Sequence, residues 1–269
     1  MAPLPLYSGG MKMLLALLLA LFATGQALAC GIETPCPLPG SDRSYHVRAP
    51  DNWDGKSPLP VLLHFHGWGR QGKLIMNHSR IAGATRPAGV LLVAPNGEGR
   101  TWKMWQANSP DVAFADAVLA DVAKRFPVDE KRLFVSGYSY GSIMAWRYAC
   151  ARGAKINTVL AISGRFRERD EPCAAPVNMV YVHGTKDGVL SYPYGASGTE
   201  ESAVDLWLTQ NGCADVADAR ENWQAVEILP FERHIWNRCT TGKRVVLDVH
   251  RRGHFIPRFW IARQLRDLL

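Results

Sequence analysis

The stretch that decides the fold is VSGYSYGSIMAW, residues 135–146. It places Ser139 between Gly137 and Gly141, where an apolar β-type run gives way to a helical pattern over 140–152. A serine on such a sharp strand-to-helix turn needs small residues two positions before and after it, because strand and helix approach each other there. The following helix also directs free N–H groups toward the serine. The pattern favours a nucleophile at Ser139, although a turn serine that merely caps the helix fits the same five residues.

Around this turn the chain alternates strand and helix patterns. Apolar runs, several of which end in Gly or Pro, predict strands that are mostly buried on both faces of a sheet, and SYHVRAP, residues 44–50, predicts a short edge strand. The predicted strands are 44–50, 60–69, 90–95, 132–137, 156–163, 177–184 and 244–250. Apolar residues at three- and four-residue steps, with start and stop signals, predict helices at 111–126, 140–152, 200–210 and 256–268. Strands that alternate with helices predict an α/β fold, with a mostly parallel central sheet and helices on both faces.

The composition is that of a globular protein. The 269 residues are 47% apolar and 20% charged, and the formal net charge is +7. Lys and Arg are scattered without a run of five basic residues, so the charge favours solubility and no nucleic-acid partner is expected. No internal repeat or linker divides the chain after the first 29 residues, and we therefore predict a single domain over 30–269.

The N-terminal segment departs from this composition. Lys12 precedes about a dozen apolar residues, which end in small residues at Ala27 and Ala29. These features are typical of a secretory signal peptide, so we predict that 1–29 is removed and that the mature chain is secreted or periplasmic, without stable membrane insertion. An uncleaved transmembrane anchor is the alternative, but the run is shorter than the roughly 20 residues that span a bilayer. Cleavage after Ala29 would make Cys30 the first residue, which leaves lipid anchoring through Cys30 open.

All six cysteines lie in the predicted mature chain. An even number in an exported protein predicts three disulfides, although six cysteines permit 15 connectivities. Nearest-neighbour pairing is the simplest choice: Cys30–Cys36, Cys150–Cys173 and Cys213–Cys239. A zinc site is the rival interpretation, and the lack of a Cys-x-x-Cys pair argues against it.

A catalytic serine needs partners elsewhere in the chain. Its hydroxyl is a poor nucleophile unless a base takes the proton and an acid orients that base. On a strand-turn-helix elbow, the acid and then the histidine follow the serine in the chain, each after a later strand. HGTKDGVL places Asp187 directly after one predicted strand, and RRGHFIP places His254 soon after the last. Asp215 and Asp218 are alternatives for the acid, and His250 is the alternative base.

Acyl transfer also needs donors for the oxyanion that develops on the substrate. HFHGWG, residues 64–69, is the Gly-rich end of the first buried strand, where a loop leaves the strand. A backbone N–H of this loop and the N–H of the residue after the serine can donate to the same oxyanion. We therefore predict that the backbone N–H groups of Trp68 and Tyr140 bind the oxyanion, with Gly67 as the alternative to Trp68. The two histidines of this segment are expected to pack at the strand end, because a His-x-His pair alone is weak evidence for a metal.

Several aromatic residues fall in segments that should reach the same face. Tyr138 flanks the serine, and Trp102 and Trp105 follow the loop APNGEGR. Such side chains can line a groove for an apolar or aromatic acyl group, and we predict that all three contact substrate. His183 ends a strand beside the predicted acid, where a structural histidine is expected.

With these residues in place, the chain resembles the secreted esterases that include polyhydroxybutyrate depolymerases, feruloyl esterases and acetylxylan esterases. The resemblance runs from about Cys30 to the C-terminus. It rests on CGIETPC followed by SYHVRAP, and on HFHGWG, APNGEGRTW, VDEKRLFVSGYSYGS, HGTKDGVL and GHFIP. It implies the α/β-hydrolase fold, no metal or organic cofactor, and a catalytic triad of Ser139, Asp187 and His254.

Two departures from the family pattern concern the substrate and the elbow. Ser142 stands where members often have a second glycine, and Phe255-Ile256-Pro257 follows the histidine where many have Trp-Pro. The expected function is a secreted serine ester hydrolase resembling polyhydroxybutyrate depolymerase, which cleaves carboxylic esters through an acyl-enzyme on Ser139, and the choice between oligomeric and polymeric esters is left open. The alternatives are a feruloyl or acetylxylan esterase that acts on plant cell-wall esters, and a non-catalytic binding protein of the same fold.

Overall fold

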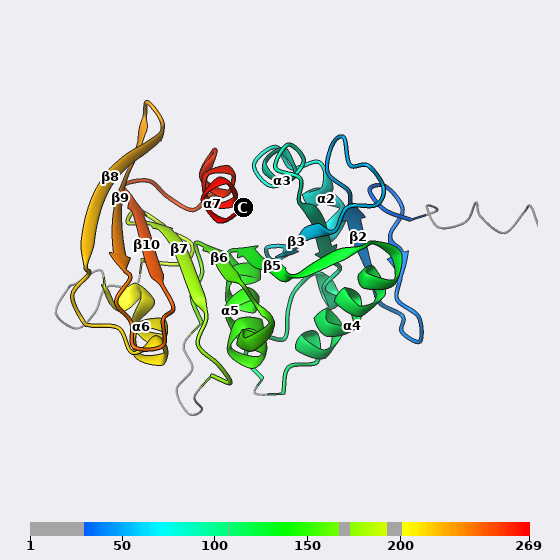
Figure 1. Cartoon of the computed structure of the whole chain (residues 1–269), viewed down its shortest axis with the longest axis horizontal. Helices are drawn as coiled ribbons and strands as arrows, with labels where there is room; N and C mark the ends of the chain where they lie inside the picture. The colour runs from blue at the N-terminus through cyan, green and yellow to red at the C-terminus, as the bar shows by residue number, and fades with distance from the viewer. Residues whose placement is uncertain (1–29, 107, 167–172, 193–200) are drawn as a thin grey trace, which may run out of the picture.

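The computed structural model describes residues 30–106, 108–166, 173–192 and 201–269, and the predicted signal peptide lies outside these ranges. The described residues form one sheet of ten strands in the order β1-β2-β4-β3-β5-β6-β7-β10-β9-β8 (Figure 1). The strands from β4 through β3, β5, β6 and β7 to β10 are parallel, and those beyond them on both sides are antiparallel. The predicted mostly parallel α/β sheet is therefore confirmed.

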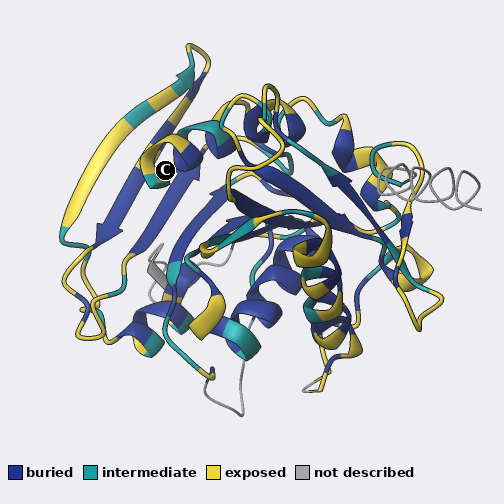
Figure 2. Ribbon diagram, turned by 45° about the vertical axis from the view of Figure 1, so that its right-hand side comes forward, coloured by how far each residue is buried: buried dark blue, intermediate teal, exposed yellow. Residues whose placement is uncertain are grey.

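Each strand predicted from an apolar run is present. The strands are β1 (Cys36–Pro37), β2 (Ser44–Arg48), β3 (Leu59–Phe65), β4 (Leu91–Pro95), β5 (Val128–Tyr138), β6 (Thr158–Ile162), β7 (Asn178–Gly184), β8 (Ala219–Val226), β9 (Leu229–Trp236) and β10 (Val245–His250). The antiparallel hairpin of β8 and β9 has no counterpart among the predicted strands. Most of β8 is exposed, since its outer face and its edge meet solvent, so it lacks the apolar run that marked the central strands (Figure 2).

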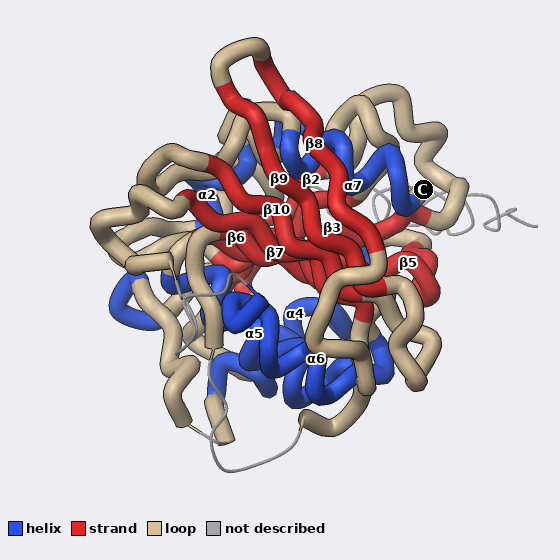
Figure 3. Tube along the Cα trace, turned by 90° about the vertical axis from the view of Figure 1, so that its left-hand side faces the viewer, coloured by secondary structure: helices blue, strands red, loops and turns tan. Residues whose placement is uncertain are grey.

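Helices cover both faces of the sheet. On one face lie α4 (Pro110–Arg125), α5 (Tyr140–Arg152) and α6 (Asp205–Asn211), and on the other α2 (Gly72–Met76), α3 (Ala82–Thr85) and α7 (Trp260–Leu268) (Figure 3). Three short 3-10 turns complete the described elements: η1 (Glu98–Arg100), η2 (Gly153–Lys155) and η3 (Glu201–Val204). The predicted helix over 256–268 is too long at its start, because Phe259 has φ 62° and the helix begins only after it.

The longest helix, α4, has the boundaries that its sequence indicates. Ser109 caps it by accepting the N–H of Asp111 at 3.3 Å, and Pro110 occupies the first helical position, where no N–H is needed. Pro127 follows its C-terminal end. Its apolar face packs against the sheet and belongs to the same hydrophobic cluster as α5.

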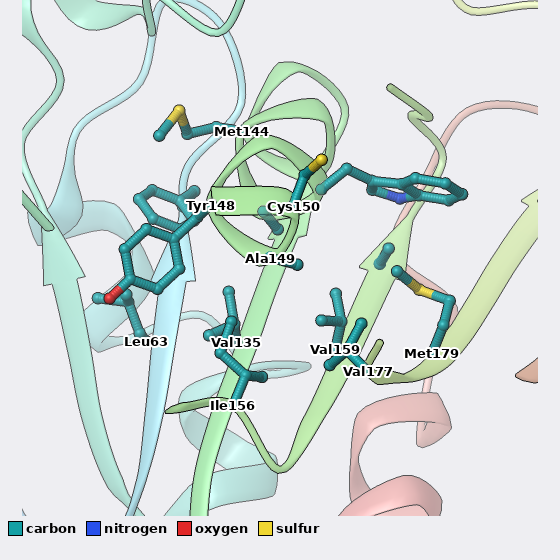
Figure 4. Packing of buried hydrophobic residues seen from close by; sticks show 14 of the residues in the cluster. Leu63, Val135, Met144, Tyr148, Ala149, Cys150, Ile156, Val159, Val177 and Met179 are labelled. Carbon is teal, nitrogen blue, oxygen red and sulfur yellow. The ribbon is translucent and has the colours of Figure 1, made fainter. Parts of the chain in front are cut away.

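The core beside α5 fixes the position of the elbow. Met144, Tyr148 and Ala149 on the helix lie over Val135 of β5 and Val159 of β6 (Figure 4). All five side chains are completely buried. Burial of this kind contributes about 25 cal/mol per Å² of apolar surface, so the helix that begins immediately after Ser139 is held firmly on the sheet.

A buried ion pair attaches the unpredicted hairpin and α7 to the sheet. Arg233 of β9 donates from Nε and Nη2 to the two carboxylate oxygens of Asp248 in β10, both at 2.8 Å. The indole N–H groups of Trp223 and Trp260 donate to the same carboxylate at 2.9 and 2.7 Å. Asp248 therefore has a structural role within the sheet.

The cysteines form Cys30–Cys36, Cys150–Cys173 and Cys213–Cys239, which is the nearest-neighbour pairing. Since Sγ of Cys30 is bonded to Cys36, it is not free for the thioether of a lipid anchor. Disulfides are typical of exported proteins.

Within the described ranges, none of the helices combines the length and the apolar character that crossing a membrane requires.

Candidate active site

Ser139 lies on a strained turn between β5 and α5. Its φ of 57° and ψ of −125° are unusual for a residue with a side chain. A Cβ on Gly137 would come within 2.0 Å of the carbonyl oxygen of Gly141, and a Cβ on Gly141 would come within 2.0 Å of that of Phe65. Only glycine fits at either position, and the turn has the geometry of a nucleophile elbow.

Ser142, which stands where the resembling family often has glycine, ties the elbow helix to the sheet. Its buried hydroxyl donates to the carbonyl of Gly164 at 2.5 Å and accepts the N–H of Ile162 at 3.0 Å. Ile162 in turn accepts the N–H of Ser139 at 2.9 Å. The hydroxyl thus satisfies two buried backbone groups at the end of β6.

We expect Ser142→Ala to lower the free energy of unfolding by about 1 to 3 kcal/mol, because it leaves a buried carbonyl and a buried N–H without their partner. Urea denaturation followed by tryptophan fluorescence measures the change. Ser79→Ala, at an exposed serine, is the matched control and should change stability by less than about 0.5 kcal/mol. Equal stability of the two variants would show that the hydroxyl contributes nothing.

Asp187 and His254 meet at the carboxyl ends of two adjacent parallel strands. Asp187 lies in the turn after β7, and His254 in the loop after its neighbour β10. Backbone hydrogen bonds join these loops, from the N–H of Thr185 to His250 and from that of Lys186 to Arg252, at 2.9 and 3.1 Å. Nδ1 of His254 lies 2.6 Å from Oδ2 of Asp187. The structure therefore brings the predicted acid and base together.

The carboxyl group of Asp187 is poised to stay ionised. Burial disfavours its charged form, but hydrogen bonds from His254 and from the backbone N–H groups of Leu190 and Val189 outweigh that effect and hold its pKa below the ordinary value. Both backbone bonds reach Oδ1 at 2.9 Å. A carboxylate that only accepts hydrogen bonds places the proton of a neutral His254 on Nδ1, which leaves Nε2 as the basic nitrogen.

The alternative acid and base lie in other surroundings. The ring of His250 packs against those of Phe231 and Phe255, and burial lowers its pKa to about 4. Oδ1 of Asp218 accepts a hydrogen bond from Nε of Arg238 at 2.7 Å. Asp215 is exposed. The imidazole of His254 is hydrogen-bonded to Asp187 and to neither of the alternative acids.

Tyr138 supports the histidine. Its hydroxyl donates to the backbone carbonyl of His254 at 3.2 Å, and the two rings lie 4.8 Å apart. Burial raises the pKa of the Tyr138 phenol to about 12, so the group keeps its proton near neutral pH.

The loop after β3 lies beside the elbow. Gly67, Trp68 and Tyr140 line one cavity together with Ser139. Tyr140 is the first residue of α5, so its N–H has no acceptor within the helix. Backbone donors from both the loop and the helix are therefore available at the serine.

Buried side chains hold that loop in place. Nε2 of His66 accepts the N–H of Gly97 at 3.0 Å, and the indole of Trp102 donates to the carbonyl of His66 at 2.7 Å. Trp102 is only 3% exposed and does not line the cavity. Trp105 is 61% exposed, lies near Phe166 and also stays outside the cavity. Trp102 therefore packs under the loop and Trp105 faces solvent, so neither of these two predicted groove residues lines this cavity.

The cavity at Ser139 has a volume of about 750 Å³. Its walls combine apolar side chains with three histidines, His254 among them, and an arginine, and several wall residues come from the loop and short helix after β3. The wall residues outside the predicted site are His64, Arg70, Leu74, Ile75, His78, Val189 and Ile256. Of the predicted groove residues, Tyr138 lines it. A cavity of this size and polarity suits a small organic ligand.

Comparison with curated proteins gives esterases as relatives. No known protein-family profile matches the chain. The chain is 28% identical over 244 residues to feruloyl esterase D of Neurospora crassa, which covers 86% of this chain and 80% of that protein. It is 29% identical to a probable feruloyl esterase C of Aspergillus flavus, over 64% of this chain and 63% of that protein. A bifunctional acetylxylan esterase/xylanase of Neocallimastix patriciarum is 26% identical over 80% of this chain and 31% of its own length.

Solved structures share the architecture. An acetyl xylan esterase from Aspergillus awamori superposes with a TM-score of 0.61 at 12% identity, over 80% of this chain and 90% of that one. A Bacillus cereus carboxylesterase superposes with a TM-score of 0.55 at 15% identity, over 85% of this chain and 94% of that one. The chain has the α/β-hydrolase fold. The sequence relatives support an esterase, and their names fit the feruloyl or acetylxylan alternative better than the polyhydroxybutyrate depolymerase prediction.

Proposed function

We propose that the protein is an exported serine carboxylic ester hydrolase in which Ser139, His254 and Asp187 act as nucleophile, base and orienting acid. The observation that carries the proposal is the 2.6 Å hydrogen bond between Asp187 and His254 at a cavity that both His254 and the elbow residue Ser139 line. This combination, with the acid and base following the serine in the chain, is what ester hydrolysis on such an elbow requires.

Catalysis begins with proton transfer from the hydroxyl of Ser139 to Nε2 of His254 as the oxygen attacks the ester carbonyl. The backbone N–H groups of Trp68 and Tyr140 stabilise the resulting oxyanion. The imidazolium, held by ionised Asp187, then protonates the leaving alcohol. Water activated by the same histidine releases the acid from the acyl-enzyme and restores the serine.

For the substrate, we propose feruloyl or acetyl esters of plant cell-wall polysaccharides. The support comes from the activities for which the sequence relatives are named and from the apolar cavity walls formed by Trp68, Leu74, Ile75 and Ile256. Apolar walls favour an aromatic acyl group by burial, and a large cavity also admits acetyl esters.

A substrate panel tests this proposal. We expect kcat/KM for methyl ferulate or acetylated xylan to exceed that for 3-hydroxybutyrate oligomers by at least about tenfold, which is within what apolar pockets discriminate. Initial rates at equal enzyme concentration, with p-nitrophenyl acetate as the reference ester, measure it. A preference for hydroxybutyrate oligomers would instead support the depolymerase, and no hydrolysis of any ester would support a non-catalytic protein.

A further inference from the structure

A second histidine lies against the predicted catalytic acid. His183, in β7, is 2% exposed, and its Nε2 lies 3.0 Å from Oδ2 of Asp187 and 2.8 Å from the carbonyl oxygen of Leu190. Its other nitrogen, Nδ1, bonds the hydroxyl of Tyr181. Both ring nitrogens therefore have partners in the protein.

These partners fix the position of the ring hydrogen. Burial lowers the pKa of His183, so the imidazole is neutral and carries one N–H. A carboxylate and a carbonyl both accept hydrogen bonds only, so the hydrogen is on Nε2. Nδ1 is then the acceptor for Tyr181, whose phenol keeps its proton because burial raises its pKa.

Neighbouring rings prevent the imidazole from turning. The rings of Tyr181 and Tyr192 meet it edge to face at 5.6 and 5.4 Å. Trp146 packs on Tyr181 in the same way at 5.5 Å. Trp146 belongs to α5, the helix that follows Ser139, so continuous packing links the elbow helix to His183.

We infer that His183 is a positioning residue for Asp187, an inference that rests on the proposed roles of Ser139, His254 and Asp187. Oδ1 is held by the backbone N–H groups of Val189 and Leu190, and Oδ2 lies between His254 and His183. Donors at both oxygens stop rotation of the carboxylate plane. The carboxylate therefore keeps Oδ2 directed at His254 throughout the catalytic cycle.

An ordinary core histidine would not have this arrangement. An apolar side chain of similar size could fill the space, but it would remove one donor from Asp187 and leave the carbonyl of Leu190 and the hydroxyl of Tyr181 without their imidazole partner. Because Leu190 also donates its N–H to Asp187, His183 closes the turn from 187 to 190 around the carboxylate.

Two substitutions separate the hydrogen bond from the packing. His183→Gln keeps an N–H near the position of Nε2, whereas His183→Leu fills the space without a donor. We expect His183→Leu to lower kcat by about 10- to 100-fold with KM within about threefold, since small misplacements of catalytic groups have effects of this size. His183→Gln should restore kcat to within about fivefold of the unmodified enzyme. Steady-state hydrolysis of p-nitrophenyl acetate measures both constants.

A more conservative variant and a matched control keep the test decisive. Tyr181→Phe removes only the hydroxyl that donates to Nδ1 of His183 and holds the ring in place, and should lower kcat by about 2- to 5-fold, even if His183→Leu fails to fold. His234→Leu replaces another buried histidine, in β9, and should lower the melting temperature without changing kcat by more than about twofold.

The outcomes distinguish this inference from the proposed function. Folded His183→Leu with kcat within twofold of the unmodified enzyme, or Leu and Gln variants that are equally impaired, would overturn the role of His183 while Ser139→Ala remained inactive. Full activity in Ser139→Ala would overturn the proposed function, and the positioning role with it. If only Tyr181→Phe folds, an unchanged kcat in that variant counts against the inference.

Discussion

Replacing Ser139 by alanine is expected to lower kcat for p-nitrophenyl acetate by about 10⁴- to 10⁶-fold, the range measured when a triad nucleophile is removed. Without the hydroxyl, no acyl-enzyme forms, and His254 can only activate water directly. The fold should survive, because alanine occupies less space than serine and the structure shows α5 anchored by its buried apolar face. Stopped-time assays with concentrated enzyme are needed to measure the residual rate.

Ser163→Ala is the matched control for Ser139→Ala. Ser163 is also a buried serine with positive φ, 50°, and it lies immediately after the adjacent strand β6. It does not line the cavity, so kcat should stay within about threefold. A fluorophosphonate probe should label the unmodified enzyme and Ser163→Ala but not Ser139→Ala. Labelling or hydrolysis that persists in Ser139→Ala would place the nucleophile elsewhere.

The parts of the fold that can be predicted from the sequence are those with a local physical signature. Strands buried on both faces are apolar along most of their length, and the six predicted runs with this character are all strands. The elbow needs Gly137 and Gly141 because backbone atoms occupy the space of a Cβ. The hairpin of β8 and β9 lacks such a signature, since its stability depends on Arg233 and Asp248, which meet only after folding.

The site divides in the same way. Chain order after the strands predicts that Asp187 and His254 lie close together, because parallel strands bring their following loops to one edge of the sheet, and the two side chains are hydrogen-bonded. The residues of the cavity wall could not be predicted from the sequence. Leu74 and Ile75 lie in α2, a helix of five residues that is too short to show an apolar periodicity. The position of Trp102 could not be predicted either, because it depends on a tertiary contact: its indole N–H donates to the buried carbonyl of His66 beneath the loop.

Substrate preference depends on these wall residues, which the sequence does not predict. Three of the motifs that carry the family resemblance contain the elbow, the acid and the histidine, and the resemblance implies that the three kinds of esterase share the chemistry at these positions. Arg70 and His78 add polar groups to apolar walls, and neither belongs to the motifs around the triad. In the proposed function, the motif residues carry out the reaction, whereas the segment after β3 shapes the cavity that the substrate enters.

The replacement Asp187→Asn is expected to lower kcat by about 10³- to 10⁴-fold, although it changes the size of the side chain very little. The amide has one acceptor oxygen, and the backbone N–H groups of Val189 and Leu190 require an acceptor at the position of Oδ1. The amide nitrogen then occupies the position of Oδ2 and donates to Nδ1 of His254. This forces the histidine proton onto Nε2, where the base should be.

The same substitution also places the new amide N–H group against the N–H of His183, because His183 donates to the position of Oδ2. Asp218→Asn is the matched control, since Asp218 is the alternative acid and its carboxylate instead binds Arg238. That variant should keep kcat within about twofold. A plot of log kcat against pH for each variant separates loss of the correct tautomer, which lowers the plateau, from a simple change in the base's pKa, which moves the limb. Asp187→Asn with more than a tenth of the original plateau, or a larger loss in Asp218→Asn, would remove Asp187 from the triad.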